Sequence, residues 1–445
     1  MTTQTAEPRI LRGRFTRALV LENPDPSLDD FLKGYGFEVE RVDDPPTEEG
    51  ALIKILERFE PHLIFKRSRV EITERVIQAT PSLFGVMLCC IGDDSVDKEA
   101  CARGGVMVVN DPISNGRSVA EMVIGEIICL SRRIFEATKD ADNNKWDKSG
   151  TARYEVQGKT LGVVGLGNIG KQVAQLGQAL GMKITFFDNR EVPQEVGSVL
   201  GWSPAPSMEE LFERSHIVSV HLSATDHSGI SNQNVLTGPV LAALGRSAGP
   251  GPRIFINAAR GFIYEPDDLI AAVRAGAIEY ACVDVFPREP HHKGEAWVNP
   301  YAEIRGIYGT PHIGAATQEA QPRIARHVAT STRNFSHHGR IRDCVLSPKA
   351  PLGLAEGELP PYILAVVHSD MRGTKKAIDE AIFDAHLSNL SSAHRDFPAY
   401  GIAYDVSGLD GPMEAGHIEA MIARANAYTD TSDAIRSVRV IKTGP

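Results

Sequence analysis

The sequence predicts an α/β protein in which one doubly wound parallel sheet is inserted into another, followed by a small βαββαβ unit. Short β-branched runs alternate with helical patterns over the first 110 residues, and the same alternation restarts at Lys159. Beyond a Pro/Gly/Glu-rich segment at 347–361, the order changes to strand, helix, two strands, helix and strand. Alternating strands and helices are typical of parallel sheets covered by helices on both faces.

Composition limits the class of protein. The 445 residues suffice for about three domains of roughly 150 residues each. No apolar run approaches the roughly 20 residues that a membrane-spanning helix requires, and the first residues lack the apolar core of a secretory signal. A net charge of −10 argues against a nucleic-acid surface, and six cysteines within apolar segments predict reduced core thiols. We therefore expect a cytoplasmic protein without nucleic-acid or membrane partners.

The first sheet belongs to a substrate-binding domain that we expect at 15–114 and 315–346, after a flexible tail at 1–14. Its predicted strands are 18–22, 37–42, 62–66, 83–89 and 106–110. This domain is predicted to be flavodoxin-like. Ser118 and Glu121 have the spacing of a capping box, which predicts a long helix from there to about Lys139.

The second sheet belongs to an inserted domain that we expect at 115–314. Its predicted strands are 160–165, 183–188, 217–222, 253–257, 280–285 and 306–310. A helix at 317–338 and a linker at 347–361 follow. The tail, 362–445, has predicted strands at 362–367, 389–394, 400–406 and 435–441 and helices at 375–385 and 414–427, which is the order of a split βαβ unit.

A glycine-rich turn after the strand 160–165 predicts a dinucleotide site of the Rossmann type. The turn contains Gly165, Gly167, Asn168, Ile169 and Gly170. The first glycine permits a tight turn, the second lets the backbone approach a pyrophosphate, and the third lets the helix pack on the strand. Asp188 ends the next strand, where a carboxylate binds ribose hydroxyls and repels a 2′-phosphate. This favours NAD as cofactor, although Arg190 could attract the phosphate of NADP.

Polar residues follow three strands of the inserted domain, where ligands of parallel sheets bind. Arg260 follows the strand 253–257, Glu289 follows 280–285, and His312 follows 306–310. A histidine can accept and return the proton of a secondary alcohol, and a carboxylate can fix its tautomer. An arginine can bind a substrate carboxylate through two donors. Together these residues predict a dehydrogenase site, whereas each alone is more typical of a loop.

Other histidines are given no catalytic role. His221 also ends a predicted strand, and either a cofactor-side position or a packing position fits it. His291 and His292 are expected in a solvated loop. Because no third ligand is evident near them, no metal site is predicted.

The segments GVVGLGNIG, INAARG, VDVFPREP and TPHIG resemble the D-isomer-specific 2-hydroxyacid dehydrogenase family over residues 17 to 345. The resemblance implies that Arg260 orients the substrate, that Glu289 is the partner carboxylate, and that His312 is the acid/base. It further implies that Asp284 lies near the nicotinamide carboxamide, with Ala258 also on the cofactor side.

Three segments resemble the branch of the family that oxidises 3-phospho-D-glycerate, the first step of L-serine biosynthesis. Lys66-Arg67-Ser68-Arg69 implies a phosphate site in which Arg67, Ser68 and Arg69 take part. The segments beginning at Asn115 and Trp146 imply that Asn115 and Lys148 bind substrate, with Lys148 supplied by a partner subunit. A glyoxylate/hydroxypyruvate or other D-2-hydroxyacid reductase and a non-catalytic NAD(H)-sensing scaffold are the alternatives.

The tail resembles the regulatory ACT domain of that branch. The resemblance implies a homodimer or homotetramer with L-serine as effector, bound by His368, Asp370 and Asn389. Asp370 stands where that branch usually has asparagine. A tail that binds another ligand, or that serves only assembly, is the alternative.

Overall fold

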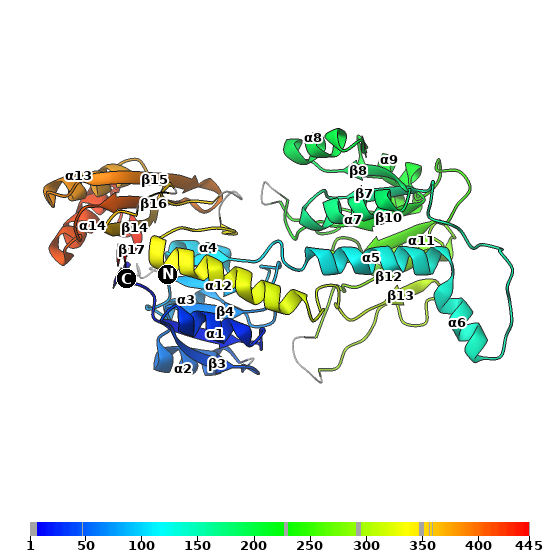
Figure 1. Cartoon of the computed structure of the whole chain (residues 1–445), viewed down its shortest axis with the longest axis horizontal. Coiled ribbons are helices and arrows are strands. Elements are labelled where there is room, and N and C mark those ends of the chain that lie inside the picture. The colour runs from blue at the N-terminus through cyan, green and yellow to red at the C-terminus, as the bar shows by residue number, and fades with distance from the viewer. Residues whose placement is uncertain are drawn as a thin grey trace. The chain divides into compact units, whose positions relative to one another are not determined.

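The computed structural model describes residues 7–46, 48–226, 230–290, 295–346, 351–355, 357 and 359–444. The chain divides into two compact units, Met1–Pro112 with Gln321–Pro445, and Ile113–Ala320. The division lies close to the domain boundaries expected at 114 and 315. The first unit contains two sheets and the second unit contains one (Figure 1).

The parallel sheet of the first unit has the strand order β3-β2-β4-β5-β6. Its strands are β2 (Arg17–Leu21), β3 (Glu38–Val42), β4 (Leu63–Lys66), β5 (Gly85–Leu88) and β6 (Met107–Val109). Its helices are α1 (Ser27–Gly34), α2 (Glu49–Phe59), α3 (Glu74–Gln78), α4 (Lys98–Arg103) and α12 (Ala320–His338). The order matches flavodoxin-like sheets, which confirms the predicted class. The central strands are fully buried, as their continuous apolar runs indicate.

The second unit has a seven-stranded parallel sheet in the order β13-β12-β11-β10-β7-β8-β9. Its strands are β7 (Thr160–Val164), β8 (Lys183–Phe187), β9 (Ser203–Pro204), β10 (Ile217–Val220), β11 (Ile254–Asn257), β12 (Tyr280–Val283) and β13 (Ile307–Gly309). Its helices are α5 (Gly116–Ser131), α6 (Ile134–Asp142), α7 (Asn168–Ala179), α8 (Glu191–Val199), α9 (Met208–Arg214), α10 (Gly238–Ala242) and α11 (Pro266–Arg274). The Rossmann-type sheet is confirmed, and only the two-residue β9 was not predicted.

The predicted capping box and single long helix are wrong. Helix α5 begins at Gly116, and the hydroxyl of Ser118 instead forms a 2.9 Å hydrogen bond with that of Thr317. Glu121 pairs with Arg117 one turn away. The helix ends at Ser131 because Arg133 has a left-handed φ of 55°, and a second helix, α6, starts after it. The side chain of Ser118 therefore contacts a segment far along the chain and does not cap the helix, although its local spacing fits a capping box.

The C-terminal sheet has the order β1-β17-β14-β16-β15. Its elements are β14 (Tyr362–Ser369), α13 (Thr374–Asp384), β15 (Asn389–Phe397), a 3₁₀ turn at Pro398–Tyr400, β16 (Ile402–Leu409), α14 (Ala415–Thr429) and β17 (Ile435–Lys442). This is the predicted βαββαβ order. The expectation of a flexible tail at 1–14 is wrong in part, because β1 (Arg9–Arg12) pairs in parallel with β17. The two ends of the chain therefore lie side by side (Figure 1).

A buried arginine joins the C-terminal sheet to the parallel sheet of the same unit. The guanidinium of Arg439, in β17, lies 3.6 Å from the ring centroid of Phe15. It donates hydrogen bonds to the carbonyls of Phe335 and Ser336 at the end of α12. Burying this cation requires such partners. The C-terminal domain is therefore packed on its neighbour within the unit.

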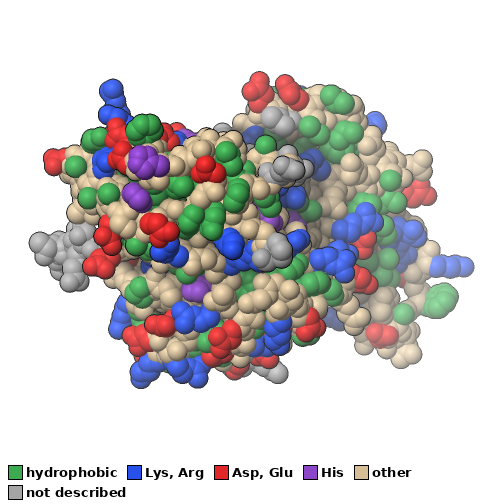
Figure 2. Space-filling view, turned by 60° about the vertical axis from the view of Figure 1, so that its left-hand side comes forward, with side chains coloured by type: hydrophobic (Ala, Val, Ile, Leu, Met, Phe, Trp, Pro, Cys, Tyr) green, Lys and Arg blue, Asp and Glu red, His purple; other side chains and the backbone are tan. Residues whose placement is uncertain are grey.

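The surface and the cysteines agree with the composition. Acidic and basic side chains are interspersed on the face shown in Figure 2. None of the described helices is both long enough and apolar enough to cross a bilayer. No disulfide joins the six cysteines, all of which lie within the described ranges.

Candidate active site

The glycine-rich turn has the geometry that a pyrophosphate needs. Gly165 has a φ of 89°, and a Cβ there would lie 2.7 Å from the carbonyl oxygen of His221. A Cβ on Gly170 would lie 2.0 Å from the carbonyl oxygen of Gly165. By contrast, a Cβ on Gly167 would meet no atom within 4 Å, so the backbone there is open to a ligand. Asn168 and Ile169 begin α7, whose amino terminus faces this turn and attracts anions.

Asp188 lies directly after β8, beside a cavity of about 480 Å³. Its carboxylate accepts hydrogen bonds from the Leu166 amide at 2.8 Å and from the guanidinium of Arg190 at 2.7 and 2.8 Å. Burial raises the pKa of Asp188, but the hydrogen bonds and charge of Arg190 outweigh burial, so the pKa is lowered overall. Arg190 therefore holds a charged carboxylate in place at the position where the sequence predicts ribose binding.

His312 and Glu289 form a pair. Nδ1 of His312 lies 2.7 Å from Oε2 of Glu289, and Oε1 of Glu289 accepts a hydrogen bond from the Phe286 amide at 3.0 Å. The hydrogen bond that Nδ1 of His312 donates to Glu289 raises the pKa of His312 above its usual value. Burial raises the pKa of Glu289, but the hydrogen bond and charge of His312, the Phe286 amide and the charge of Arg260 together outweigh burial, so the pKa is lowered overall and the carboxylate stays ionised. With Nδ1 engaged, Nε2 of His312 is the nitrogen that can exchange a proton with a substrate.

Asp284 fixes the loop that contains His312. One oxygen of its buried carboxylate accepts hydrogen bonds from the Thr310 hydroxyl at 2.6 Å and the Ile313 amide at 2.8 Å. The other oxygen accepts one from the Gly314 amide at 2.8 Å. His312 itself has a left-handed φ of 53°, a strained conformation that persists only where surroundings enforce it. The family resemblance implies that Asp284 lies near the nicotinamide carboxamide, and its role in holding this loop was not predicted.

Arg260 lies three residues beyond the end of β11 and is half-buried. Asn257, the last residue of that strand, donates from its side-chain amide to the Arg260 carbonyl at 3.0 Å and thereby fixes the turn. The positive charge of Arg260 acts on both Glu289 and His312. Ala258, between strand and turn, is also half-buried. The structure thus brings together the arginine, carboxylate and histidine that the sequence predicted.

The predicted phosphate loop follows β4 and is supported by a buried ion pair that the sequence analysis missed. Lys66 and Glu22 are buried, with Nζ 3.9 Å from Oε1. Glu22 accepts hydrogen bonds from the amides of Arg69 and Val70 at 3.0 and 2.5 Å, and Lys66 donates to the Arg67 carbonyl at 2.8 Å. Glu22 has a left-handed φ of 67°. Glu22 and Lys66 stand at the ends of the neighbouring strands β2 and β4, and their opposite charges could have predicted this ion pair.

The other predicted substrate residues are more dispersed. Asn115 is the buried N-cap residue of α5, and its Oδ1 has no hydrogen-bond partner among the described residues. Ser68 is exposed in the loop after β4. Lys148 is exposed on the segment that follows α6. His221 directly follows β10; burial lowers its pKa to about 3, so its imidazole is neutral, and its Nε2 contacts the Ser219 hydroxyl at 2.8 Å.

The predicted effector residues do not meet within one chain. His368 is buried near the end of β14, and Asp370 is exposed just beyond that strand. Asn389 starts β15 opposite Leu409, which pairs with Tyr362 at the other end of β14. His291 and His292 lie outside the described residues.

Comparisons with known proteins agree with this geometry. A sequence model described as "D-isomer specific 2-hydroxyacid dehydrogenase, NAD binding domain" matches residues 124–314. A putative D-3-phosphoglycerate dehydrogenase of Schizosaccharomyces pombe is 30% identical over 421 residues, which are 92% of this chain and 87% of the relative. The chain belongs to the D-isomer-specific 2-hydroxyacid dehydrogenase family. It is an NAD-dependent oxidoreductase, which confirms the predicted class and cofactor.

Two further relatives of this dehydrogenase support the assignment. D-3-phosphoglycerate dehydrogenase of Haemophilus influenzae is 34% identical over 351 residues, covering 78% of this chain and 82% of that relative. The crystal structure of the TT0316 protein from Thermus thermophilus has a TM-score of 0.59 at 26% identity. The structural match covers 71% of the present chain and 96% of the Thermus thermophilus protein. The dehydrogenase fold therefore accounts for most of the chain.

Proposed function

We propose that this dehydrogenase oxidises 3-phospho-D-glycerate to 3-phosphohydroxypyruvate with NAD⁺, the first step of L-serine biosynthesis. The observation that supports this most directly is the 2.7 Å His312–Glu289 pair beside Arg260, in a chain whose full-length relatives are named D-3-phosphoglycerate dehydrogenase. The reaction is removal of a hydride from C2 and of a proton from its hydroxyl group.

The residues of the site divide this work. Arg260 offers two parallel donors to the substrate carboxylate and orients C2. Nε2 of His312 accepts the hydroxyl proton, and the ionised Glu289 stabilises the imidazolium that results. Gly167, the amino terminus of α7 and Asp188 would hold the pyrophosphate and ribose of the cofactor. When bound, NAD⁺ supplies the hydride acceptor.

The pH dependence should reveal the coupling of His312 to Glu289. Oxidation requires neutral His312, so kcat/KM should rise with pH through the raised pKa of this histidine. Glu289→Gln replaces the charged acceptor that raises the His312 pKa with a neutral amide, so this limb should move to lower pH and the plateau should fall at least about tenfold. Initial rates across pH measure both effects. A limb that stays in place would show that Glu289 does not set the His312 pKa.

The substrate phosphate is proposed to bind the loop formed by Arg67, Ser68 and Arg69. The Lys66–Glu22 pair gives this loop a fixed backbone, and two guanidinium groups suit a phosphate dianion. Asn115 and Lys148 are proposed as further substrate-binding residues, because the segments that contain them resemble the branch of the family that oxidises 3-phospho-D-glycerate.

A substrate panel tests the proposed reaction. NADH formation is followed with 3-phospho-D-glycerate, glycerate, lactate and 2-hydroxyglutarate at equal concentrations. We expect a clear preference for the phosphorylated acid. A preference for an unphosphorylated acid would favour another D-2-hydroxyacid reductase, and cofactor binding without turnover of any acid would favour an NAD(H)-sensing scaffold.

Arg67→Ala should separate phosphate binding from chemistry. Loss of one charge-assisted contact of about 1.5–3 kcal/mol should raise KM for 3-phosphoglycerate by roughly 10–10²-fold and leave kcat within a fewfold. The KM for glycerate should be unchanged. Arg103→Ala, at an exposed arginine of α4, is the matched control. Equal effects on both substrates would place the phosphate elsewhere.

We also propose that the enzyme is a homodimer or homotetramer in the cytoplasm, with L-serine as effector. Strand β15 is nine residues long and lies at an edge of the C-terminal sheet. An open strand edge favours pairing with another chain, which supports assembly. Light scattering after gel filtration and inhibition assays with L-serine test these two points. A monomer would contradict the first, and unchanged activity at high L-serine would contradict the second.

A further inference from the structure

Three adjacent strands of the C-terminal sheet bring metal-ligating atoms together. His368 of β14, His394 of β15 and Asp405 of β16 each offer one ligand atom, and these atoms lie within 4.8 Å of one another. His394 pairs directly with Asp405, and Asp405 pairs with Val366, two residues before His368. Paired residues and residues two apart share a face, so all three side chains lie on one face of the sheet. It is the face on which Val366 packs against α13.

We propose that His368, His394 and Asp405 bind a divalent transition-metal ion such as Zn²⁺. Two imidazole nitrogens and one carboxylate oxygen are a ligand set that this class of ion prefers, with a fourth position left to water. The prediction of no metal site rested on His291 and His292, which have no evident third ligand. His368, His394 and Asp405 are far apart in the chain and have no short-range spacing that would suggest a site.

His368 is held in the state that a metal ligand requires. Its Nδ1 lies 2.7 Å from the backbone carbonyl of Ser369, to which it donates in the neutral tautomer. Its Nε2 finds no hydrogen-bond partner among the described residues, although the residue is only 2% exposed. A buried polar atom without a partner is costly, and a metal ion would satisfy it. Metal-bound histidines commonly donate their other nitrogen to a carbonyl or carboxylate, as here.

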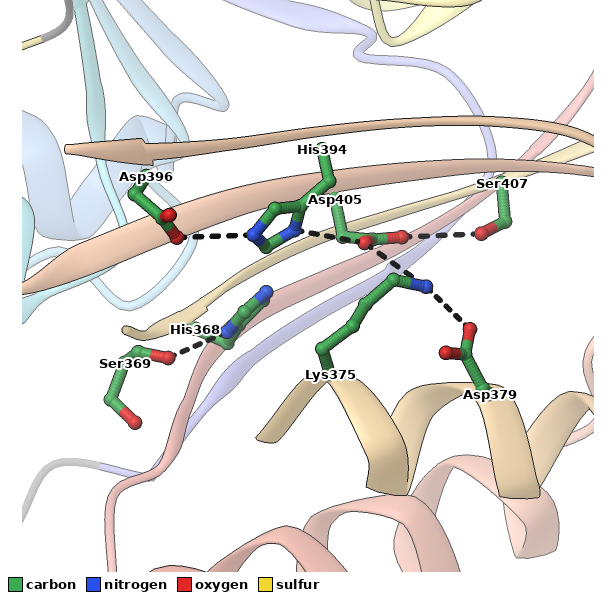
Figure 3. Close-up of polar contacts among 8 residues, drawn as sticks. All are labelled: His368, Ser369, Lys375, Asp379, His394, Asp396, Asp405 and Ser407. Carbon is green, nitrogen blue, oxygen red and sulfur yellow. Dashed lines mark hydrogen bonds and ion pairs between the residues drawn. The ribbon is translucent and has the colours of Figure 1, made fainter. Parts of the chain in front are cut away.

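His394 has an outer partner of the same kind. Its Nε2 lies 3.0 Å from Asp396, while its Nδ1 lies 3.2 Å from Oδ2 of Asp405 (Figure 3). Ligand atoms on a tetrahedral zinc with bonds near 2.1 Å are about 3.4 Å apart. His394 and Asp405 are therefore already at ligand spacing, and a metal ion would replace the proton between them. His394 is partly exposed, which gives the ion a path of entry.

The net negative charge around Asp405 favours binding of a cation. In this structure the ammonium of Lys375 is the cation next to Asp405. Nζ of Lys375, in the first turn of α13, lies 3.3 Å from Oδ2 of Asp405 and also pairs with Asp379 (Figure 3). Three carboxylates lie around the site, those of Asp379, Asp396 and Asp405. With the histidines neutral, their three negative charges exceed the single positive charge of Lys375 by two. Lys375 can keep Asp379 when a metal ion takes Asp405. Metal binding would thus exchange one cation for another at a buried carboxylate.

Cobalt titration of the full-length enzyme tests the site. After dialysis against a chelator, Co²⁺ should bind with the strong visible bands of a tetrahedral N/O site, and Zn²⁺ should displace it at one ion per chain. His394→Gln should weaken this binding at least tenfold. His386→Asn removes an exposed imidazole of the same domain, at a left-handed position that asparagine tolerates, and should leave binding unchanged.

A second variant predicts the opposite change. Lys375→Met removes the competing ammonium and should tighten Co²⁺ binding severalfold, which a misfolded domain would not do. Absence of the visible bands, binding that survives His394→Gln, or weaker binding in Lys375→Met would each overturn the proposal. NADH formation is measured in parallel, because failure of the proposed reaction leaves the Co²⁺ result intact. L-Serine is added in a separate arm, and its binding at His368 without any metal would identify an amino-acid site instead.

Discussion

His312→Ala is expected to lower kcat for 3-phosphoglycerate oxidation by about 10²–10⁴-fold, the range that a positioned general base contributes. The imidazole lies 2.7 Å from Glu289, has a raised pKa, and leaves Nε2 for the substrate proton. Nothing in the glycine-rich turn or around Asp188 depends on this side chain, so NAD⁺ should bind with wild-type affinity. Steady-state rates and fluorescence titration of NADH measure the two quantities.

The matched control is His386→Asn, which removes an exposed imidazole from the C-terminal domain and should keep full activity. Added imidazole should partly restore turnover in His312→Ala, since the deleted group leaves space beside Glu289. Turnover within tenfold of wild type in His312→Ala would refute its assignment as the acid/base.

Arg260→Ala is expected to lower kcat/KM by roughly 30- to 4,000-fold. Truncating one partner of a hydrogen-bonded charge pair costs about 2–5 kcal/mol, and each 1.4 kcal/mol is tenfold. The proposed role of the guanidinium is both to bind the substrate carboxylate and to orient C2, so kcat and KM should both change. Arg260→Lys should recover little, since an ammonium lacks the two parallel donors.

Arg253, at the opposite end of β11, provides the matched control. Arg253→Ala removes an exposed arginine that flanks the same strand and should leave kcat/KM unchanged. If Arg260→Ala raised KM alone, the arginine would bind substrate without orienting it for the reaction. If it changed neither constant, the substrate carboxylate would bind to another group.

Local patterns were sufficient to predict much of the fold and the grouping of Arg260, Glu289 and His312. Gly165, Gly167 and Gly170 follow a buried apolar strand, and only glycine tolerates the close approaches found at the first and third positions. Arg260, Glu289 and His312 each follow a strand of one parallel sheet, so the rule that such ends share an edge brings them together.

Patterns failed where a distant segment competed with a local signal. Ser118 has capping-box spacing, yet its hydroxyl contacts Thr317 and the helix begins at Gly116. Residues 9–12 lie in a polar, arginine-containing stretch that predicts a flexible tail, yet they pair with the edge of β17. In both cases the deciding contact comes from far along the chain, which no window of sequence contains.

The pattern of residues along the chain was enough to predict the two parallel sheets, the terminal βαββαβ unit and the glycine-rich turn, and to group Arg260, Glu289 and His312 at one sheet edge, because strand ends and glycines act locally. Only the tertiary structure decided that Asp284 holds the loop of His312, and that Glu22 and Lys66 shape the loop of Arg67. It alone aligned His368, His394 and Asp405 across three strands. Such groupings depend on strand register, which is set by the packing of the whole sheet and not by neighbouring residues.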